Sequence, residues 1–129
     1  MAFALLLVGC SVAPHPPLQN DAIASFVGKR YLFHYDSGLQ VEAYYVSDEQ
    51  LQWKALTGPS AGTSGNERIY TITLAPHLYF ISWVESNGTT VSNVVDLSRV
   101  RVASFVTFQG ATARQALTDE GSIHEIAAP

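Results

Sequence analysis

The chain has 129 residues, of which 47% are apolar and 14% are charged, so it is long enough for one domain with a hydrophobic core and too apolar for a disordered chain. Its formal net charge is −4 and no Lys/Arg cluster is present, which argues against nucleic acid as a partner. The single cysteine, Cys10, excludes an internal disulfide and a cysteine-based metal cluster.

The N-terminus, MAFALLLVGC, is an apolar run that ends in Leu7-Val8-Gly9-Cys10. The run is shorter than the about 20 apolar residues that span a bilayer, and it resembles a bacterial lipoprotein signal whose cysteine is acylated. We therefore expect residues 1–9 to be a signal peptide and Cys10 the lipid attachment point, although no Lys or Arg precedes it. The alternative is a cytosolic protein with an apolar N-terminal arm and a buried thiol.

The lipoprotein interpretation predicts a place in the bacterial cell envelope, with the membrane as a partner through the lipid anchor. Ser11 after the cysteine gives no inner-membrane retention signal, which favours the outer membrane and its periplasmic face. Residues 10–25 contain Pro14, Pro16 and Pro17 and little to bury, so we expect an extended tether. The folded domain is then expected over residues 26–129.

From Phe26 onward apolar and polar residues alternate with period two, which predicts β-strands joined by short turns. A Gly-rich loop is expected at 57–66, and residues 111–121 contain helix formers that end at Gly121, a suitable helix C-cap. The expected strands are 28–36, 39–46, 50–56, 67–74, 78–85, 89–97, 99–108 and 122–127.

Strands in this sequential order predict an all-β fold, an eight-stranded antiparallel up-and-down (lipocalin-like) barrel with one short helix near the C-terminus. A curved, partly open sheet closed by the helix is the alternative. A barrel of this size is either filled by side chains or holds one small ligand.

Strand parity places several aromatic side chains inside the barrel, where they would either grip a planar ligand or simply fill the space. These residues are Tyr31, Phe33, Tyr35, Trp53 and Trp83. Asn93 shares the inward parity of Thr89, so it is either an inward polar group or part of a cross-strand hydrogen bond.

Glu85 lies two residues after Trp83, so the two side chains share a face of the strand. A carboxyl group inside a barrel loses hydration and its pKa rises, which suits proton transfer near neutral pH. The alternative is a solvated charge beside the Asn87-Gly88 turn. The four histidines lack metal-ligand spacing, so we expect no metal and no cofactor.

Two segments, FVGKRYLFHYDSGLQVEAYY (26–45) and YFISWVESNGTTVS (79–92), resemble the phenolic acid decarboxylases and the related MoaF-like domains. The resemblance implies a small lipocalin-like barrel with its site inside and no cofactor. It assigns the family's buried glutamate to Glu85 and one first-strand tyrosine to Tyr35, with Thr89 as a further hydroxyl near Glu85. Related barrels often pair, so a homodimer is one alternative for the oligomeric state, which the sequence leaves open.

The groups that hold the substrate carboxylate in the decarboxylases are largely replaced here. One tyrosine position falls on Phe33, a second on Val41, and the arginine position falls on Thr63-Ser64. These departures favour the MoaF-like branch over decarboxylation.

Three functions follow from these patterns. The first is a MoaF-like lipoprotein that binds a small aromatic or amphiphilic ligand inside its barrel. The second is a cofactor-free lyase with Glu85 as proton donor and Tyr35 as orienting group. The third is a non-catalytic structural module of the envelope, for which an exposed apolar strip on the outer face would be the distinguishing sign.

Overall fold

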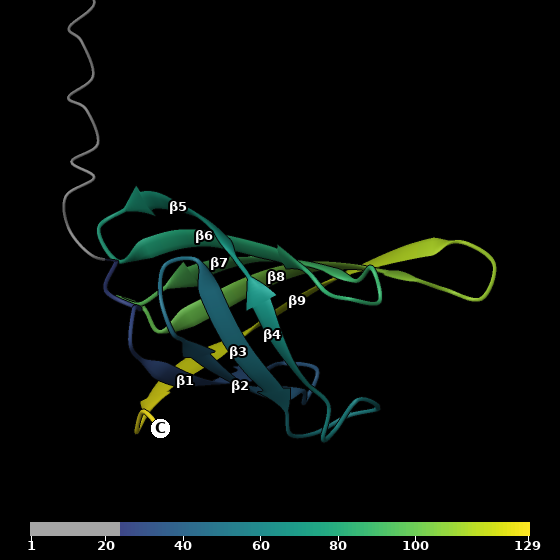
Figure 1. Ribbon diagram of the computed structural model, residues 1–129, viewed down its shortest axis with the longest axis horizontal. Helices are drawn as coiled ribbons and strands as arrows, with labels where there is room; N and C mark the ends of the chain where they lie inside the picture. The colour runs from purple at the N-terminus through teal and green to yellow at the C-terminus, as the bar shows by residue number, and fades with distance from the viewer. Residues whose placement is uncertain (1–23) are drawn as a thin grey trace, which may run out of the picture.

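The computed structural model describes residues 24–129, so the expected signal peptide, Cys10 and most of the tether lie outside the described residues. Within this range the chain forms nine β-strands (Figure 1). No helix of this range is long and apolar enough to cross a membrane. The strands are β1 (Arg30–Tyr35), β2 (Gln40–Tyr45), β3 (Gln50–Ala55), β4 (Ser64–Arg68), β5 (Tyr70–Ala75), β6 (Leu78–Val84), β7 (Thr90–Asp96), β8 (Arg101–Gln109) and β9 (Arg114–Ile126).

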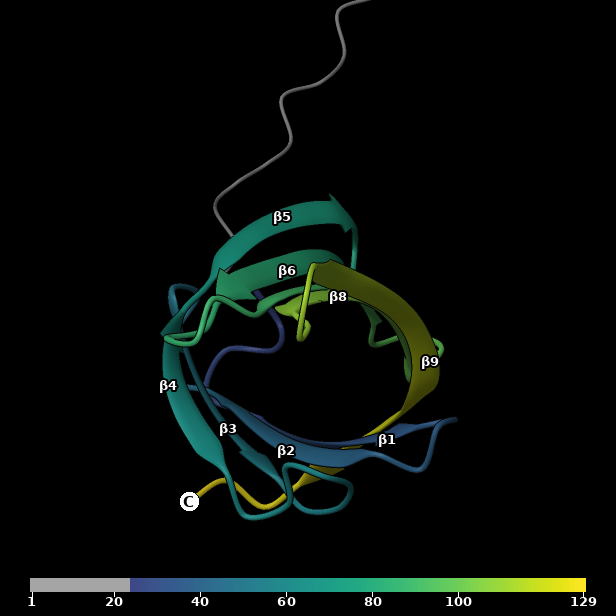
Figure 2. The same ribbon diagram turned by 90° about the vertical axis from the view of Figure 1, so that its right-hand side faces the viewer.

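All nine strands belong to one antiparallel sheet with the order β4-β3-β2-β1-β9-β8-β7-β6-β5. Every neighbour pair but one is also consecutive in sequence; the exception is β1 with β9, which joins the two ends of the folded domain. The sheet curls until β4 and β6 come into contact (Figure 2). The predicted antiparallel up-and-down barrel is confirmed, with nine strands in place of eight.

The predicted strand at 67–74 is in fact two strands that meet at Ile69. β4 pairs with β3 and β5 pairs with β6, so the chain changes partner at this one residue. The Ile69 side chain is 2% exposed, and its N–H donates to the Glu49 carbonyl at 2.9 Å. Ile69 therefore links β4 and β5, which are the two edge strands of the sheet. We call the place where these two edges meet the seam.

The predicted helix at 111–121 is wrong, because these residues lead into and form the outer part of β9. Residues Arg114–Ser122 pair with β8 over its whole length, in the long hairpin that extends beyond the barrel in Figure 1. A helix here would have had little to bury, since Leu117 is its one large apolar residue and is 45% exposed. The hydrogen bonds of the ladder with β8 stabilise a strand here more than the helix propensity of these residues would stabilise a helix. Three of the ten residues of the expected loop at 57–66 likewise belong to a strand, because Ser64, Gly65 and Asn66 begin β4.

One end of the barrel is filled by aromatic rings. The Phe26 ring lies 4.9 Å from the Tyr45 ring and 4.9 Å from the Tyr79 ring, and Tyr31 packs against Tyr45 at 6.1 Å. All four residues are at most 4% exposed. At this end the inward aromatic residues form the core, which leaves the other end of the barrel as the place for a site.

Gly121 is a point of close approach between β9 and β1, where it lies opposite Tyr35. A Cβ atom at this position would overlap the His34 carbonyl and would lie 2.8 Å from the Tyr35 Cα. The glycine therefore allows β9 to close the barrel against β1.

We predict that Gly121→Ala lowers the free energy of unfolding by about 1–3 kcal/mol, because both clashes involve backbone that cannot move aside. Urea denaturation followed by circular dichroism measures the change. Ser122→Ala, one residue further along β9, is the matched control and should change stability by less than about 0.5 kcal/mol. Equal losses in the two variants would contradict this role of Gly121.

Candidate functional site

The end of the barrel opposite Phe26 is less tightly covered. Along β6, Trp83 lies four residues beyond Tyr79, which corresponds to about 13 Å. Leu39, Val41 and Val106 pack against the core there but remain partly exposed. We call this end the mouth, and define it by these residues together with Trp53, Glu67, Trp83 and Glu85.

On one side of the mouth, Trp53 of β3 pairs with a carboxylate of β4. The Trp53 Nε1–H donates to Glu67 Oε1 at 3.3 Å. Glu67 lies opposite the fully buried Leu51 in the β3–β4 ladder, so both side chains point to the inner face. Gly65 lies opposite Trp53, and a Cβ there would be 2.7 Å from the indole Cε2. Because Gly65 has no side chain, the Trp53 indole can lie against its backbone.

On the other side, Trp83 and Glu85 repeat the same arrangement. The Trp83 Nε1–H donates to Glu85 Oε1 at 3.4 Å, and the half-buried Glu85 directly follows β6. Its backbone is fixed by the turn that follows. The Glu85 N–H donates to the Thr89 carbonyl at 2.8 Å, and the Gly88 N–H donates to the Glu85 carbonyl at 2.9 Å.

Burial raises the pKa of Glu85 above the ordinary value of 4.5. The hydrogen bond from Trp83 opposes this rise, and the negative charge of Glu67 adds to it. Among residues 24–129, neither carboxylate forms an ion pair with Lys or Arg. The mouth therefore combines two indoles with two carboxylates, and the charge of Glu67 disfavours ionisation of Glu85.

An arginine of the β8–β9 hairpin holds the turn beside Glu85. Arg114 Nη2 donates to the Gly88 carbonyl at 2.6 Å and to Thr107 Oγ1 at 2.8 Å. The hairpin and the turn that carries Glu85 are thereby fixed to each other.

A buried polar chain crosses the interior apart from Glu85. The Tyr35 hydroxyl lies 3.0 Å from Ser104 Oγ, and Ser104 donates in turn to Asn93 Oδ1. Desolvation raises the pKa of Tyr35 to about 12, against the opposing effect of the Ser104 hydrogen bond. Tyr35 therefore stays neutral at physiological pH, and its hydroxyl has a structural partner.

The expected site residues lie in different parts of the barrel. Trp53, Trp83 and Glu85 come together at the mouth, with Val41 beside them. Tyr31 and Phe33 belong to the filled core, at 4% and 2% exposure. Asn93 is an inward polar group and also makes a cross-strand hydrogen bond, so both alternatives for it hold. Thr89 contributes its carbonyl to Glu85 rather than a hydroxyl contact.

Sequence reasoning missed two residues of these arrangements. Ser104 alternates with Val102 and Val106 in β8, so parity alone could have placed it inside. Glu67 was not singled out, although it begins the expected strand at 67–74. Only the pairing of β4 with β3 gives its direction.

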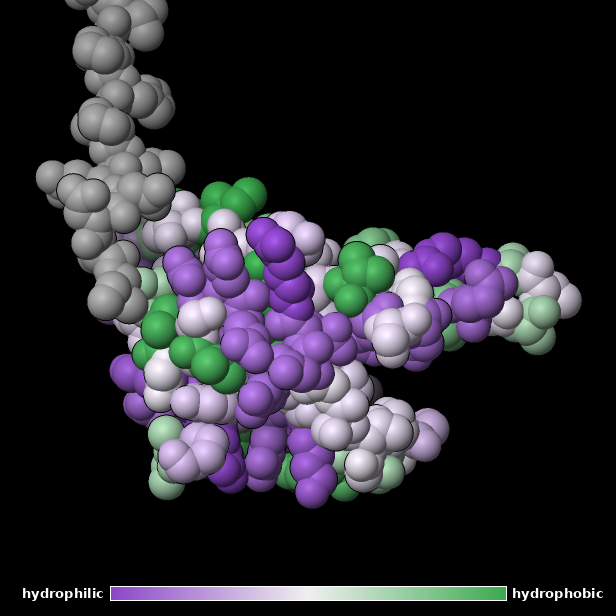
Figure 3. All heavy atoms as spheres, in the orientation of Figure 1, coloured by the Kyte–Doolittle hydropathy of each residue, from purple (hydrophilic) through white to green (hydrophobic). Residues whose placement is uncertain are grey.

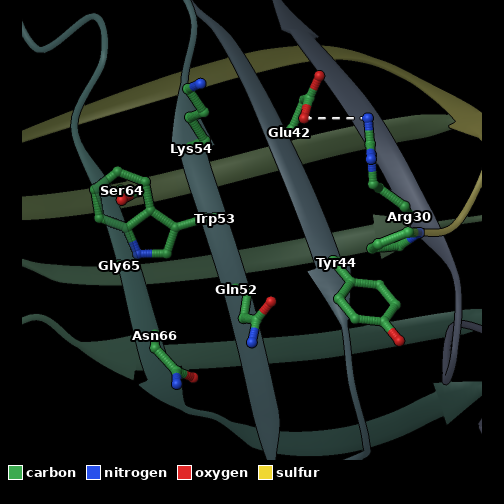
Figure 4. A pocket seen from close by; sticks show the side chains of 10 residues that line it. Arg30, Glu42, Tyr44, Gln52, Trp53, Lys54, Ser64, Gly65 and Asn66 are labelled. Carbon is green, nitrogen blue, oxygen red and sulfur yellow. Dashed lines mark ion pairs between the residues drawn. The ribbon is translucent and has the colours of Figure 1, made fainter.

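The outer face of β1–β4 holds a separate open groove of about 500 Å³. Figure 4 shows Arg30 and Glu42 within it, joined by an ion pair of 3.4 Å. Its lining is polar and charged apart from Trp53, Gly65 and Pro129, and it does not include Glu85. In residues 24–129, no three His, Cys, Asp or Glu side chains gather closely enough to hold a metal ion.

Comparison with known proteins identifies relatives of this barrel. Residues 27–123 match the MoaF-like family model. The chain is 25% identical over 80 residues to a Vibrio cholerae protein named "Probable phenolic acid decarboxylase", covering 61% of this chain and 45% of that protein. It is 28% identical over 69 residues to the phenolic acid decarboxylase PadC of Bacillus subtilis, covering 53% of this chain and 43% of PadC. The chain thus spans less than half the length of these curated relatives.

A solved structure shares the fold over most of the chain. It is a Burkholderia vietnamiensis protein described as a "putative beta-lactamase", with a TM-score of 0.73 and 25% identity. The match covers 81% of this chain and 99% of that one.

We predict that Glu85→Gln raises the melting temperature at pH 8, with a gain that shrinks as the pH falls. The folded protein binds the Glu85 proton more tightly than the unfolded chain, whose value is close to 4.5. Stability is therefore lost as the pH rises above that value through the raised pKa, and glutamine removes the loss. Thermal melts from pH 4 to pH 8 measure it. A difference that does not vary with pH would contradict the prediction, and the exposed Glu49→Gln is the control.

Proposed function

The chain belongs to the MoaF-like family, and we propose that it binds one small planar ligand at the mouth of its barrel. The observation that supports this most is the pair of Trp–Glu contacts, Trp53–Glu67 and Trp83–Glu85, on the two sides of the β4/β6 seam. Indoles supply flat apolar surfaces, and the carboxyl groups supply the few polar contacts that orient a ligand.

The charges at the mouth define the ligand further. Both acids lack a basic partner in the described part of the chain, so an anionic group would be repelled. A neutral or cationic aromatic molecule meets no such penalty, and a cation would also gain from the indole faces. We therefore propose a neutral or cationic aromatic amphiphile as the ligand class.

We further propose that the domain acts in the bacterial cell envelope, anchored through Cys10. This proposal rests on the lipoprotein-like residues 1–10 alone. Radiolabelled palmitate incorporation into the wild-type chain but not into Cys10→Ser tests it.

We predict that ligands change the intrinsic fluorescence of the protein, because both tryptophans of the sequence, Trp53 and Trp83, lie at the mouth. Titrations compare tyramine, p-cresol and p-coumarate as cationic, neutral and anionic probes. Tyramine and p-cresol should bind about 10-fold more tightly than p-coumarate, a difference of about 1.4 kcal/mol.

Glu67→Gln and Glu85→Gln should each reduce the preference for tyramine, whereas Glu42→Gln on the outer face should leave it unchanged. Trp53→Phe and Trp83→Phe show which indole reports each probe. The proposal fails if no probe alters the emission, or if Glu42→Gln has the same effect as the two mouth variants.

A second candidate function is a cofactor-free decarboxylation of a hydroxycinnamate-like acid. It is favoured by the names of the two curated relatives and by the raised pKa of Glu85. Glu85 would protonate the carbon that loses CO₂, and Tyr35 would orient the substrate. The replacements at Phe33, Val41 and Thr63 weaken this candidate, because no hydroxyl or guanidinium there can hold the substrate carboxylate.

Loss of p-coumarate absorbance with time tests the lyase. Under this proposal the wild type turns the substrate over, and Glu85→Gln lowers kcat by about 100-fold or more, because it removes the proton donor. Absence of turnover above a protein-free blank, or full turnover in Glu85→Gln, rejects it.

A further inference from the structure

The β8–β9 hairpin extends beyond the barrel at the same end as the mouth. β7 pairs with β8 only as far as Thr107, and β1 pairs with β9 only as far as Gly121, so the hairpin continues past both neighbouring strands. In Figure 2 it points toward the viewer beside the opening of the barrel. Its outer part is therefore a two-stranded ribbon, with no further strand of residues 24–129 on either side.

The inner side of this hairpin continues the apolar surface of the mouth. One row of side chains, directly opposite one another across β6, β7, β8 and β9, consists of Trp83, Val91, Val106 and Leu117. The row lies on the inward face, because Trp83 and Val91 are buried. With strands about 4.8 Å apart, it leads over about 14 Å from Trp83 to Leu117. We call this row, together with Phe108 at the next inward position of β8, the inner strip.

Exposure rises along the inner strip. Trp83 and Val91 are 7% and 9% exposed, Val106 packs against the core but is partly exposed, and Leu117 is 45% exposed. A single exposed leucine on a surface needs no explanation. Here, however, the leucine ends a continuous apolar row that begins at an indole of the candidate site, so the row forms one surface with that site.

The polar contacts that hold the hairpin lie on its other side. Arg114 Nη2 donates to Thr107 Oγ1 at 2.8 Å, and Thr107 Oγ1 lies 2.5 Å from Thr90 Oγ1. Thr107 stands between Val106 and Phe108 in β8, so its side chain points to the opposite face from theirs. The hairpin is thus fixed from its outer side, which leaves the inner strip free for a ligand.

The inner strip borders a hollow of the surface and carries no charge. Figure 3, in the orientation of Figure 1, shows the hollow between the hairpin and the segment that joins β3 to β4. Gln115, opposite Phe108, is uncharged. The inward acid of β9, Asp119, accepts a hydrogen bond of 2.6 Å from the Ser37 hydroxyl. A wall of this kind suits a hydrocarbon group rather than a charged one.

We propose that the inner strip binds a hydrocarbon chain of the ligand whose aromatic ring lies at the mouth. The inference rests on the ligand site proposed above and narrows its ligand class to aromatic amphiphiles that carry an alkyl chain. The ring lies beside Trp83, and the chain runs along Val106 and Leu117 toward the end of the hairpin. Binding then removes from water the apolar side chains that the protein itself leaves exposed.

Titration of the full chain with p-cresol and 4-hexylphenol, followed by tryptophan fluorescence, tests this inference. Each methylene group contributes about 4-fold in affinity when it is fully buried. Because one side of the chain stays in water, we expect 4-hexylphenol to bind about 30-fold more tightly than p-cresol. Leu117→Ser should reduce this gain by about 5-fold or more and leave the affinity for p-cresol unchanged.

Phe105→Ser is the matched control, because it removes a side chain of similar exposure, 48%, from the outer side of the same hairpin. It should leave the gain intact. Circular dichroism confirms that both variants are folded. Hydrogen–deuterium exchange gives a second measurement: amides of residues 106–117 should exchange more slowly with saturating 4-hexylphenol than with saturating p-cresol, because a two-stranded ribbon has little stability of its own.

Equal affinity for the two phenols, an undiminished gain in Leu117→Ser, or unchanged exchange of the hairpin amides overturns the inference while p-cresol binding still supports the mouth as the ligand site. A gain that is lost in Phe105→Ser instead places the chain on the outer surface, which also overturns it. If neither phenol binds, the proposed function and this inference fail together.

Discussion

The pairing of β1 with β9 is the constraint on which this molecule depends. It joins the first and last strands of the folded domain through a register that runs from Arg30–Ile126 to Tyr35–Gly121. Without this ladder the nine strands would form two separate sheets. The buried side chains of Phe33 and Ile123, which lie opposite each other in the ladder, would then no longer be in contact. Both the buried polar chain of Tyr35 and the position of the mouth follow from it, because Tyr35 sits where β1, β9 and β8 adjoin.

Period-two alternation was enough to predict most of the strands and the barrel, because each strand buries one side and short turns leave few topologies. It was insufficient at 111–121, where the residues of the hairpin are exposed on both sides and carry no alternation to detect. There, helix propensity pointed to the wrong element, since the ladder with β8 is a tertiary effect. The junction at Ile69 was missed for a related reason, because a one-residue change of partner leaves no turn signal in the sequence.

The residues of the candidate site could likewise be predicted only in part. Trp53, Trp83 and Glu85 could be found from parity within single strands, since each strand carries its own inside and outside. Glu67 could not, because its direction depends on which residue of β3 it faces. Nor could parity distinguish a ring that lines a space from one that fills it. The contacts of Phe26 with Tyr45 and Tyr79 decide that question at one end of the barrel, and Phe26 comes from the turn before β1.

The single-residue junction at Ile69 also limits how the protein can change shape. With no spare residue between β4 and β5, the two edges of the sheet cannot separate unless Ile69 is withdrawn from the core. Widening of the seam is thus coupled to partial unfolding, and exchange of a bound molecule must use the end of the barrel rather than its side. Lengthening another loop of this chain would leave this coupling unchanged, whereas one glycine added beside Ile69 would give β4 and β5 a spare residue with which to separate.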